Sequence, residues 1–431
     1  MKIVLAACAA LCLVTAAQGG NLDWIDGKDL SIEGRSGGVV ECYYDRLPAK
    51  LPAAINGNVQ ALLHHTSGEQ FRFTTTSPVL FFRWSPYYDA SVKRLPGCAY
   101  GSLGMAHMPA TGVSGIDVYA QAKNGIWEHR CTGFIYPGEP GSVSTGRLDN
   151  VYIEPGTPIC VNLPLYNGLK SFQLGVLPGS KVSPLPPRRS GVTKPVVFYG
   201  TSITQGGCAS RPGLGFVNII GRELDVPVVN LGFSGGGRME LAMSDELARI
   251  DASCYVLDCL GNMKDRIVET NYEPFVRRLR ALKPGVPIVL AEQSDVKGGP
   301  PNAKDLVARA VYEKLVGEGW TDLVYLPKKN MFRGSEGTVD GCHPNDLGMR
   351  MLADAFGEAV AEALKLPPKD RHAEAEGLGV RVLAPTTERP NRTESPARQN
   401  HPLKRQLNWY CRKVGDGLHA EPYRRRSRRQ A

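Results

Sequence analysis

Long hydrophobic runs are almost absent from this chain of 431 residues. The longest covers residues 3–14 and is too short to span a bilayer. Lys2 precedes this run, and the small residues Ala16 and Ala17 follow it, a pattern typical of a secretory signal peptide. A short buried helix is the alternative interpretation. We therefore expect a signal peptide over residues 1–19, a secreted or periplasmic location, and no membrane span.

Motifs that hold metals or nucleotides are also missing. None of the eleven cysteines lies in a CxxC pair or in a zinc-like Cys/His spacing, so we expect no metal and no cofactor. The chain has no P-loop sequence and no GxGxxG with a later acidic partner, which leaves a nucleotide site weakly supported. Export would permit disulfides among Cys42, Cys98, Cys131 and Cys160, but buried thiols fit the sequence equally well.

Most of the chain has no excess of either charge. The formal net charge is +9, but residues 367–431 alone hold 15 Lys/Arg and 7 Asp/Glu. The totals of 51 and 42 then leave 36 positive and 35 negative charges for the rest. The basic character therefore belongs to a polar tail that we expect to be disordered, and we expect no nucleic-acid partner.

The N-terminal half has the pattern of an all-β domain. Short alternating stretches are separated by Gly, Pro, Asn and Ser clusters over residues 20–185, which is typical of a sandwich or jelly roll. The stretches are VVECYY (39–44), FRFTTT (71–76), VLFFRW (79–84), GIDVYAQA (115–122) and SFQLGVL (171–177). The proline-rich segment 182–195 then predicts a linker.

After Pro195 the pattern changes to alternating strands and helices. Short apolar runs at 195–200, 227–232, 254–260, 287–293 and 323–327 are separated by segments with helical spacing. The last helix is predicted over 347–364. Strands buried on both faces indicate a parallel sheet in a three-layer α/β sandwich, which we assign to a second domain over residues 186–366.

Polar residues and glycines follow several of these runs, at the edge where sites form in parallel sheets. Ser202 follows the first run, where it could either begin a helix as its N-cap or point a nucleophilic hydroxyl into a crevice. Gly235 follows the second run in a glycine-rich turn, and Asn262 follows the third. A structural turn is the alternative for both.

His343 is the one histidine among the chain's eight that falls within residues 195–366. If Ser202 needs a base from its own domain, His343 is the candidate, and Asp340 on the same loop could orient its ring. A structural Asp–His pair is the alternative. The convergence of serine, histidine, aspartate and two candidate oxyanion donors at strand ends favours catalysis.

These residues resemble the four blocks of the SGNH (GDSL-type) hydrolase superfamily. Ser202 lies in GTSITQG, Gly235 in NLGFSGGG, Asn262 in LGNM and His343 in DGCHP. The resemblance covers residues 195–366 and implies a flavodoxin-like α/β/α domain. It further implies a Ser202–His343–Asp340 triad, with Ser202, Gly235 and Asn262 forming the oxyanion hole.

The resemblance extends into the first half of the chain. HMPATGVSGIDVY (107–119) is similar to the Gly-x-Asp-Leu-Tyr motif of a β-sandwich domain fused to one SGNH subgroup, and LPLYNG (163–168) is similar to the same subgroup. Two positions depart from the family pattern, because Thr201 replaces the usual aspartate and Met263 follows Asn262.

Together these features predict a secreted serine esterase that hydrolyses O-acyl esters, acetyl above all, on a carbohydrate. The expected partner is a small-molecule or glycan ester. Acyl transfer to an alcohol would use the same residues, and a lipase activity is also open. A glycan-binding protein with an inactive hydrolase scaffold is the alternative of another class, which the intact triad disfavours. The acyl group, the alcohol, the oligomeric state and the role of the tail are left open.

Overall fold

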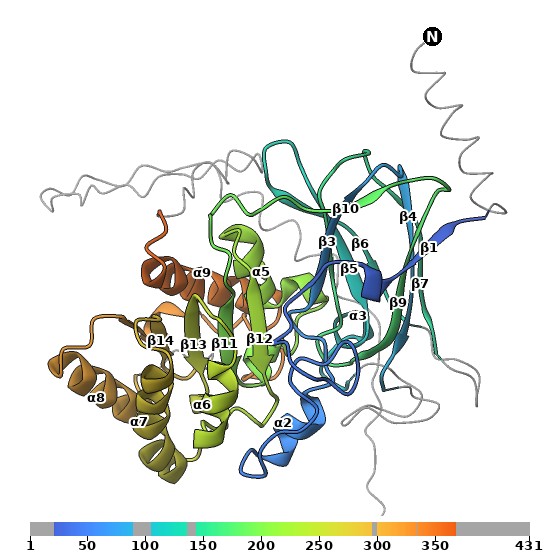
Figure 1. Ribbon diagram of the computed structural model, residues 1–431. Coiled ribbons are helices and arrows are strands. Elements are labelled where there is room, and N and C mark those ends of the chain that lie inside the picture. The colour runs from blue at the N-terminus through green and yellow to red at the C-terminus, as the bar shows by residue number, and fades with distance from the viewer. Residues whose placement is uncertain (1–20, 89–104, 136–143, 295–299, 333, 368–431) are drawn as a thin grey trace, which may run out of the picture. The chain divides into compact units, whose positions relative to one another are not determined.

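The computed structural model describes residues 21–88, 105–135, 144–294, 300–332 and 334–367 (Figure 1). The expected signal peptide, Cys98 and the tail beyond Pro367 lie outside the described residues, so these expectations stay predictions. Among the residues that are described, none of the helices has both the length and the apolar character to cross a membrane.

Two antiparallel sheets form the N-terminal part (Figure 1). The first sheet has the order β1 (Asp23–Asp26), β9 (Leu169–Val176), β4 (Val79–Pro86), β7 (Gly146–Tyr152). The second has the order β10 (Val182–Pro184), β3 (Gln70–Thr75), β8 (Ile159–Asn162), β5 (Ile116–Gln121), β6 (Trp127–Gly133), and β2 (Ile32–Glu33) also pairs with β3. Aromatic residues from both sheets, including Phe71, Phe82, Trp84 and Phe172, share one buried core. These antiparallel sheets confirm the predicted all-β character of this part.

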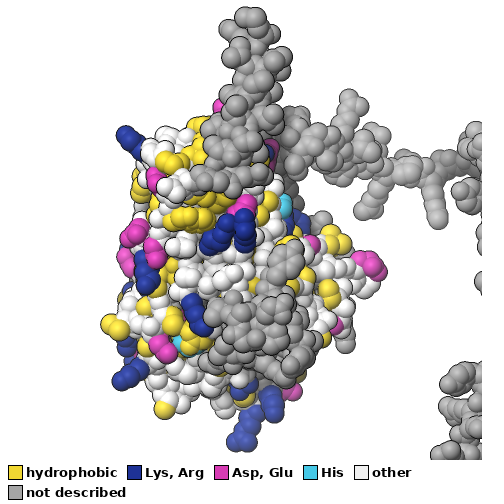
Figure 2. Space-filling view, turned by 90° about the vertical axis from the view of Figure 1, so that its right-hand side faces the viewer, with side chains coloured by type: hydrophobic (Ala, Val, Ile, Leu, Met, Phe, Trp, Pro, Cys, Tyr) yellow, Lys and Arg dark blue, Asp and Glu magenta, His cyan; other side chains and the backbone are white. Residues whose placement is uncertain are grey.

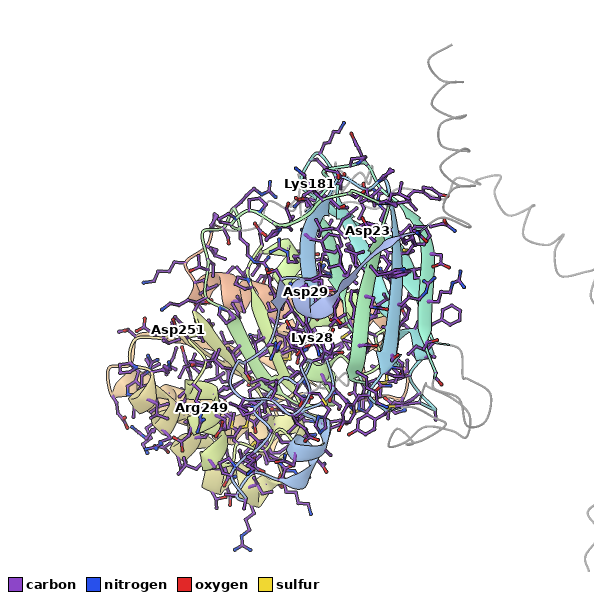
Figure 3. The ribbon with its side chains drawn as sticks, turned by 45° about the vertical axis from the view of Figure 1, so that its right-hand side comes forward. Asp23, Lys28, Asp29, Lys181, Arg249 and Asp251 are labelled. Atoms are coloured by element: carbon purple, nitrogen blue, oxygen red, sulfur yellow. The ribbon has the colours of Figure 1, made fainter. Side chains whose placement is uncertain are left out.

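Residues next to both sheets hold the turn between β9 and β10. Asp23, at the start of β1 and labelled in Figure 3, accepts a hydrogen bond from the Gly179 N–H at 2.8 Å. Lys181 follows that turn, and its N–H donates to Thr76 Oγ1 at 2.9 Å. The segment predicted as a linker thus begins with a strand, because β10 completes the edge of the second sheet beside β3.

One predicted strand is wrong. Residues 39–44 contain turns and bends where the alternation predicted a strand. Asp45 accounts for the difference, because its Oδ2 accepts the Cys42 N–H at 2.8 Å while its own N–H donates to the Cys42 carbonyl at 3.0 Å. These bonds occupy backbone groups that a strand would offer to a neighbour.

The C-terminal part is built on a parallel sheet of the order β12 (Val228–Gly232), β11 (Val196–Gly200), β13 (Cys254–Asp258), β14 (Ile288–Ala291), β15 (Leu323–Leu326). Every strand in it is buried except for one partly exposed residue of β15. In chain order the sheet is 2-1-3-4-5, the flavodoxin-like arrangement. The predicted fold class is therefore confirmed, and the ends of β12 and β13 lie on either side of the end of β11.

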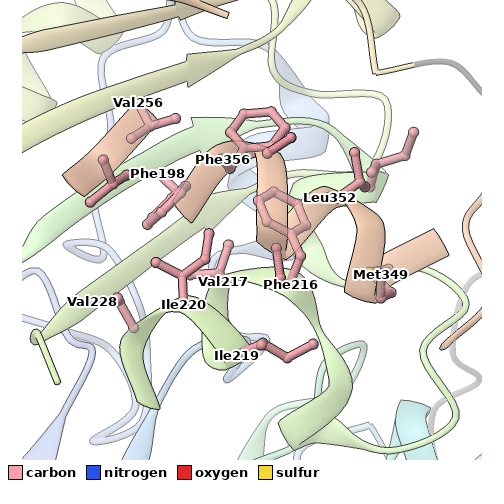
Figure 4. Packing of buried hydrophobic residues seen from close by; sticks show 14 of the residues in the cluster. Phe198, Phe216, Val217, Ile219, Ile220, Val228, Val256, Met349, Leu352 and Phe356 are labelled. Carbon is pink, nitrogen blue, oxygen red and sulfur yellow. The ribbon is translucent and has the colours of Figure 1, made fainter. Parts of the chain in front are cut away.

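Helices cover both faces of this sheet (Figure 1). The helices are α5 (Phe216–Glu223) and α9 (Asp346–Ala363) on one face, and α6 (Leu241–Ala248), α7 (Asp265–Leu282) and α8 (Ala303–Gly317) on the other. In the first layer, Phe216 of α5 lies between Phe198 of β11 and Phe356 of α9, with ring centroids 6.0 and 4.9 Å away (Figure 4). In the second, Tyr199 of β11 stacks on Phe275 of α7 at 5.7 Å.

The N-terminal part also contributes to the cores on both sides of the parallel sheet. Val59 of α2 (Gly57–Leu62) and Leu63 join the core of α6 and α7, whereas Val113 of α3 (Ala110–Val113) joins the core of α5 and α9. The described residues therefore share packing across the predicted boundary at residues 185 and 186, and that boundary stays a prediction.

Figure 2 shows basic and acidic side chains intermixed over the described part of one face. This distribution agrees with the near-neutral charge of the chain outside its tail.

Candidate active site

Ser202 is the first residue of α4 (Ser202–Gln205), directly after β11. The helix N-cap is the preceding residue, Thr201, whose side chain accepts the Ile203 N–H at 3.2 Å. The Thr201 N–H in turn donates to Thr204 Oγ1 at 3.1 Å and completes a capping box. The alternative role of Ser202 as N-cap is therefore wrong, and Thr201 in place of the family's aspartate performs this capping.

His343 and Asp340 meet Ser202 from a loop between β15 and α9. Ser202 Oγ lies 3.0 Å from His343 Nε2, although 141 positions separate them in the sequence. His343 Nδ1 lies 2.7 Å from Asp340 Oδ2. An ionised Asp340 only accepts hydrogen bonds, so the ring proton belongs on Nδ1 and Nε2 is left to accept the serine hydroxyl. The structure thus brings together the three residues predicted as the triad.

Asp340 is held as a carboxylate. Its Oδ1 accepts the N–H groups of His343 and Cys342 at 2.7 and 2.9 Å. Partial burial favours the neutral acid, but hydrogen bonds from the His343 backbone and ring and from the Cys342 N–H outweigh it and lower the pKa of Asp340 to about 2. The carboxylate can therefore stabilise positive charge on His343.

Two predicted oxyanion residues, Gly235 and Asn262, follow the strands that flank β11. Gly235 lies three residues beyond the end of β12, in a turn with a φ of 66° that favours glycine. Gln205 of α4 joins this turn to the nucleophile, because its Oε1 accepts the Ser234 N–H at 2.9 Å. Asn262 ends the short helix η3 (Leu260–Asn262) beyond β13, and its Oδ1 is buried without a partner among the described residues. Both residues therefore lie just beyond the carboxyl ends of the strands next to β11.

Residues of the N-terminal part reach the nucleophile, which sequence reasoning left open. The Tyr166 hydroxyl donates to the Ser202 carbonyl at 2.8 Å. Gln205 Nε2 lies 2.9 Å from His65 Nδ1, so this nitrogen accepts, and burial holds the pKa of His65 well below its usual value. Tyr166 lies in the LPLYNG segment, which resembles the family subgroup, but no sequence pattern singled out Tyr166 or His65 as a neighbour of the nucleophile.

The Gly-x-Asp-Leu-Tyr-like motif holds the loop that follows the nucleophile helix. Asp117 is fully buried in β5, and its Oδ2 accepts from Arg211 Nη1 and from the Gly213 N–H, both at 2.8 Å. Tyr119 accepts a second hydrogen bond from Arg211 at 2.5 Å. The motif therefore anchors the segment around η2 (Pro212–Leu214).

The same loop reaches the histidine block on its other side. The N–H and hydroxyl of Ser210 donate to the carboxylate of Asp346 at 2.8 and 2.6 Å. Asp346 is the first residue of α9, three positions after His343. Hydrogen bonds thus run from the sandwich strand β5 through one loop to the helix that follows the catalytic histidine candidate.

A buried carboxyl lies beneath α4. Thr204 Oγ1 donates to Asp258 Oδ2 at 2.8 Å, and Ser294 Oγ donates to Asp258 Oδ1 at 3.0 Å. Burial raises the pKa of Asp258 to about 7, although these two hydrogen bonds oppose the rise. The position of α4 therefore depends on a group that titrates near neutral pH.

A pocket of about 210 Å³ lies beside the Ser234–Gly235 turn. It is lined by Asn58, Ala61, Leu62, His65, Met105, Tyr166 and Ser234. Tyr166 also contacts Ser202, and Ser234 precedes Gly235, so the pocket adjoins both the nucleophile and the candidate oxyanion turn. The pocket is therefore separated from Ser202 by Tyr166 and from Gly235 by one position in the chain.

The structure partly decides whether the cysteines of the N-terminal part form disulfides or are buried thiols. Cys131 and Cys160 carry free thiols, and burial raises the pKa of each to about 12. Within the described ranges, two groups of side chains have positions that could hold a metal ion, His107 with Cys208 and His343, and Cys42 with Asp45 and His64. Sequence spacing did not indicate either group, because their members come from separate segments.

Two family models match the chain. One describes the GDSL-like lipase/acylhydrolase family and matches residues 193–361, and the other describes the GxDLY N-terminus of SGNH hydrolase-type esterases and matches residues 22–182. The chain belongs to the SGNH (GDSL-type) hydrolases, in the subgroup that carries a GxDLY N-terminal domain. It is an enzyme that hydrolyses ester bonds.

Solved structures share this architecture. A protein described as a GDSL-like lipase from Bacteroides ovatus is 27% identical, with a TM-score of 0.68, and the match covers 81% of this chain and 100% of that one. A salicylyl-acyltransferase from a tetracycline biosynthetic pathway is 19% identical, with a TM-score of 0.61, and covers 81% of this chain and 99% of its own. The second shows the shared fold alone. Among curated proteins, none matches the chain significantly.

Proposed function

We propose that this enzyme is a secreted serine esterase that removes O-acyl groups, acetyl above all, from a carbohydrate. The observation that carries the proposal is the chain of contacts from Ser202 Oγ to His343 Nε2 at 3.0 Å and from His343 Nδ1 to Asp340 at 2.7 Å. The expected signal peptide supports secretion. The sandwich residues beside the nucleophile support a substrate larger than a simple acyl ester.

Acylation begins when Ser202 Oγ attacks the ester carbonyl carbon. His343 Nε2 accepts the hydroxyl proton as the new C–O bond forms, and the resulting imidazolium faces the Asp340 carboxylate. The tetrahedral intermediate collapses when the C–O bond to the leaving alcohol breaks and His343 returns the proton to that oxygen. Water then repeats the sequence on the acyl-enzyme and releases the acid.

The negative charge on the carbonyl oxygen is met by donors already in place. The Ser202 N–H lies in the first turn of α4, where backbone N–H groups have no partner within the helix. We assign the other two donors to the Gly235 N–H and the Asn262 side-chain amide. Such donors stabilise the transition state because they need no reorientation as the charge develops.

Replacing the nucleophile tests the proposal directly. Ser202→Ala should lose at least about 10³-fold in kcat on an activated acetyl ester, since the residual rate would come only from binding and the oxyanion donors. Ser335→Ala, an exposed serine in a loop, is the matched control and should keep the wild-type rate. Near-normal turnover by Ser202→Ala would show that another residue is the nucleophile.

The substrate class needs its own experiment. The wild-type enzyme should release acetate from acetylated glycans, with Ser202→Ala as the blank. Adding candidate alcohols to the same reaction separates hydrolysis from acyl transfer, because transfer yields a new ester in place of free acid. Hydrolysis of simple esters without any release from glycans would contradict the carbohydrate part of the proposal.

A further inference from the structure

Three potential metal ligands gather at the triad from distant parts of the chain. His107 belongs to the N-terminal part, Cys208 follows α4, and His343 lies on the loop before α9. One ligand atom from each lies within 4.8 Å of the other two. The rings of His107 and His343 have centroids 5.3 Å apart. His107 is exposed and Cys208 is buried, so the group is open to solvent on one side only.

These ligand types suit a soft divalent cation such as Zn²⁺. Zinc binds imidazole nitrogen at about 2.0–2.1 Å and thiolate sulfur at about 2.3 Å in a tetrahedron, which places ligand atoms roughly 3.4–3.6 Å apart. The present separations of up to 4.8 Å are wider than these values, so the three ligand atoms would have to draw closer when a metal binds. With three protein ligands, a fourth position would be left for water.

His343 already has the arrangement of a metal ligand. Its Nδ1 pairs with Asp340 at 2.7 Å, which leaves Nε2 with the free electron pair. A carboxylate that holds the far ring nitrogen in this way orients histidine ligands in many metal sites. The same Nε2 is the atom that lies 3.0 Å from Ser202 Oγ, so it cannot serve a metal and the serine at once.

Cys208 occupies an unusual position for its residue type. Its φ is 86°, in the left-handed region that residues with a side chain rarely adopt, and its side chain is buried. Glycine would fit this backbone better, and glycines lie directly before it at 206 and 207. The cost of this conformation is consistent with a use for the thiol itself.

We propose that His107, Cys208 and His343 form an inhibitory site for Zn²⁺ or a similarly soft divalent cation, whose binding withdraws His343 from Ser202. On binding, the thiol proton of Cys208 is released to solvent, and the sulfur and two imidazole nitrogens donate electron pairs to the metal. No electron is transferred. The inhibitory part rests on the proposed function, whereas the binding part does not.

The group of Cys42, Asp45 and His64 provides a matched control. Its Asp45 is already engaged, because Oδ1 lies 2.8 Å from His64 Nδ1 and Oδ2 accepts the Cys42 N–H at 2.8 Å. A metal would have to displace these contacts. His64→Ala therefore changes a second metal-like group of the chain without touching the triad.

Cobalt(II) tests binding independently of turnover. Added to the full chain, Co²⁺ should produce a thiolate-to-cobalt charge-transfer band in the near ultraviolet. The band should be absent in Cys208→Ser and weakened in His107→Ala, while His64→Ala and Ser202→Ala keep it. A band of equal strength in Cys208→Ser, or no band in any chain, would overturn the site.

Zinc titration tests inhibition. Wild-type hydrolysis of an activated ester should fall with added Zn²⁺ and recover on adding a chelator. The His107→Ala protein should fold normally, because His107 is exposed. Relative to its own zinc-free rate, this variant should need at least about tenfold more zinc than the wild type for half-inhibition. His64→Ala should match the wild type. If the cobalt band depends on Cys208 but zinc does not inhibit hydrolysis, the inhibitory role is wrong, and the result also counts against His343 as the base. Failure of the proposed function alone would give a different result, namely full turnover by Ser202→Ala.

Discussion

At the scale of single residues, helix capping and nucleophilic attack are assigned to two different residues, although a serine after a strand could do either. Thr201 caps α4 through its own hydroxyl, so the Ser202 hydroxyl is free to contact His343. The resemblance led us to expect an aspartate at the position of Thr201, and the threonine hydroxyl accepts a helix-capping hydrogen bond from the Ile203 N–H there. The departure from the family pattern therefore leaves the nucleophile in place.

Asn262 is the side-chain donor of the predicted oxyanion hole, and its replacement is a direct test. Asn262→Ala should lower kcat by about 10²–10³ with little change in KM, because the lost donor acts mainly on the transition state. Steady-state kinetics on an activated ester measure the effect. Asn330→Ala, at an exposed asparagine in η4 (Lys328–Asn330), should behave as the wild type. Equal kcat values for both variants would remove Asn262 from the site.

At the scale of elements, the strand β11 and helix α4 form one unit with the buried Asp258 of β13. Thr204 connects them, because its hydroxyl accepts from the Thr201 N–H and donates to Asp258. The N-terminal turn of α4 therefore rests on a carboxyl whose ionised form is costly to bury.

Asp258 should make stability depend on pH. Burial raises its pKa from 3.8 to about 7, so the folded chain binds a proton that the unfolded chain has released between these values. The contribution of Asp258 to the free energy of unfolding should therefore be largest below pH 4, fall between about pH 4 and pH 7, and level off above, a loss on the order of 4 kcal/mol.

Asp258→Asn should flatten this profile, since the amide keeps an acceptor for Thr204 and has no charge to bury. Urea unfolding across the same pH window measures the difference. Asp251→Asn, at a side chain 73% exposed, should keep the wild-type slope. Identical slopes for the wild type and Asp258→Asn would show that Asp258 does not titrate in this window.

At the scale of the whole molecule, the sandwich helps to hold the catalytic domain. Asp117 binds the loop of Arg211 and Gly213, and Ser210 of that loop binds Asp346 at the start of α9. Arg46, fully buried, donates to the carbonyls of Asn230 and Gly232 at the end of β12 at 2.9 and 2.8 Å. Two blocks of the candidate site are thus held by side chains from the other part of the chain.

Asp117→Ala should cost about 3–5 kcal/mol of unfolding free energy, because it leaves the Arg211 guanidinium without its carboxylate partner in a poorly solvated position. Urea unfolding measures this loss, and kcat below the transition should also fall as the loop relaxes. Glu154→Ala breaks an exposed pair with Lys123 and should change stability by less than about 1 kcal/mol. If Asp117→Ala also changed the free energy of unfolding by less than about 1 kcal/mol, Asp117 would not hold the loop of Arg211 and Gly213 in place.

The periodicity of apolar residues and the residue types that follow the apolar runs were sufficient to predict much of the fold and the location of the site. The buried runs at 195–200, 227–232 and 254–260 predicted β11, β12 and β13, and the residues after them predicted where the site lies. Residues 39–44 show the limit, since their alternation predicted a strand that the hydrogen bonds of Asp45 prevent. A local pattern cannot report a competing side-chain contact.

By itself, the sequence determined the order of strands and helices, the parallel sheet and the candidate triad, because burial periodicity and the carboxyl-end rule act along the chain. Only the tertiary structure decided that Tyr166 contacts Ser202, that Asp117 holds Arg211, and that His107 and Cys208 approach His343. These contacts join residues tens to hundreds of positions apart. Such pairs leave no period or spacing in a single sequence, and they exist only once the two parts of the chain pack together.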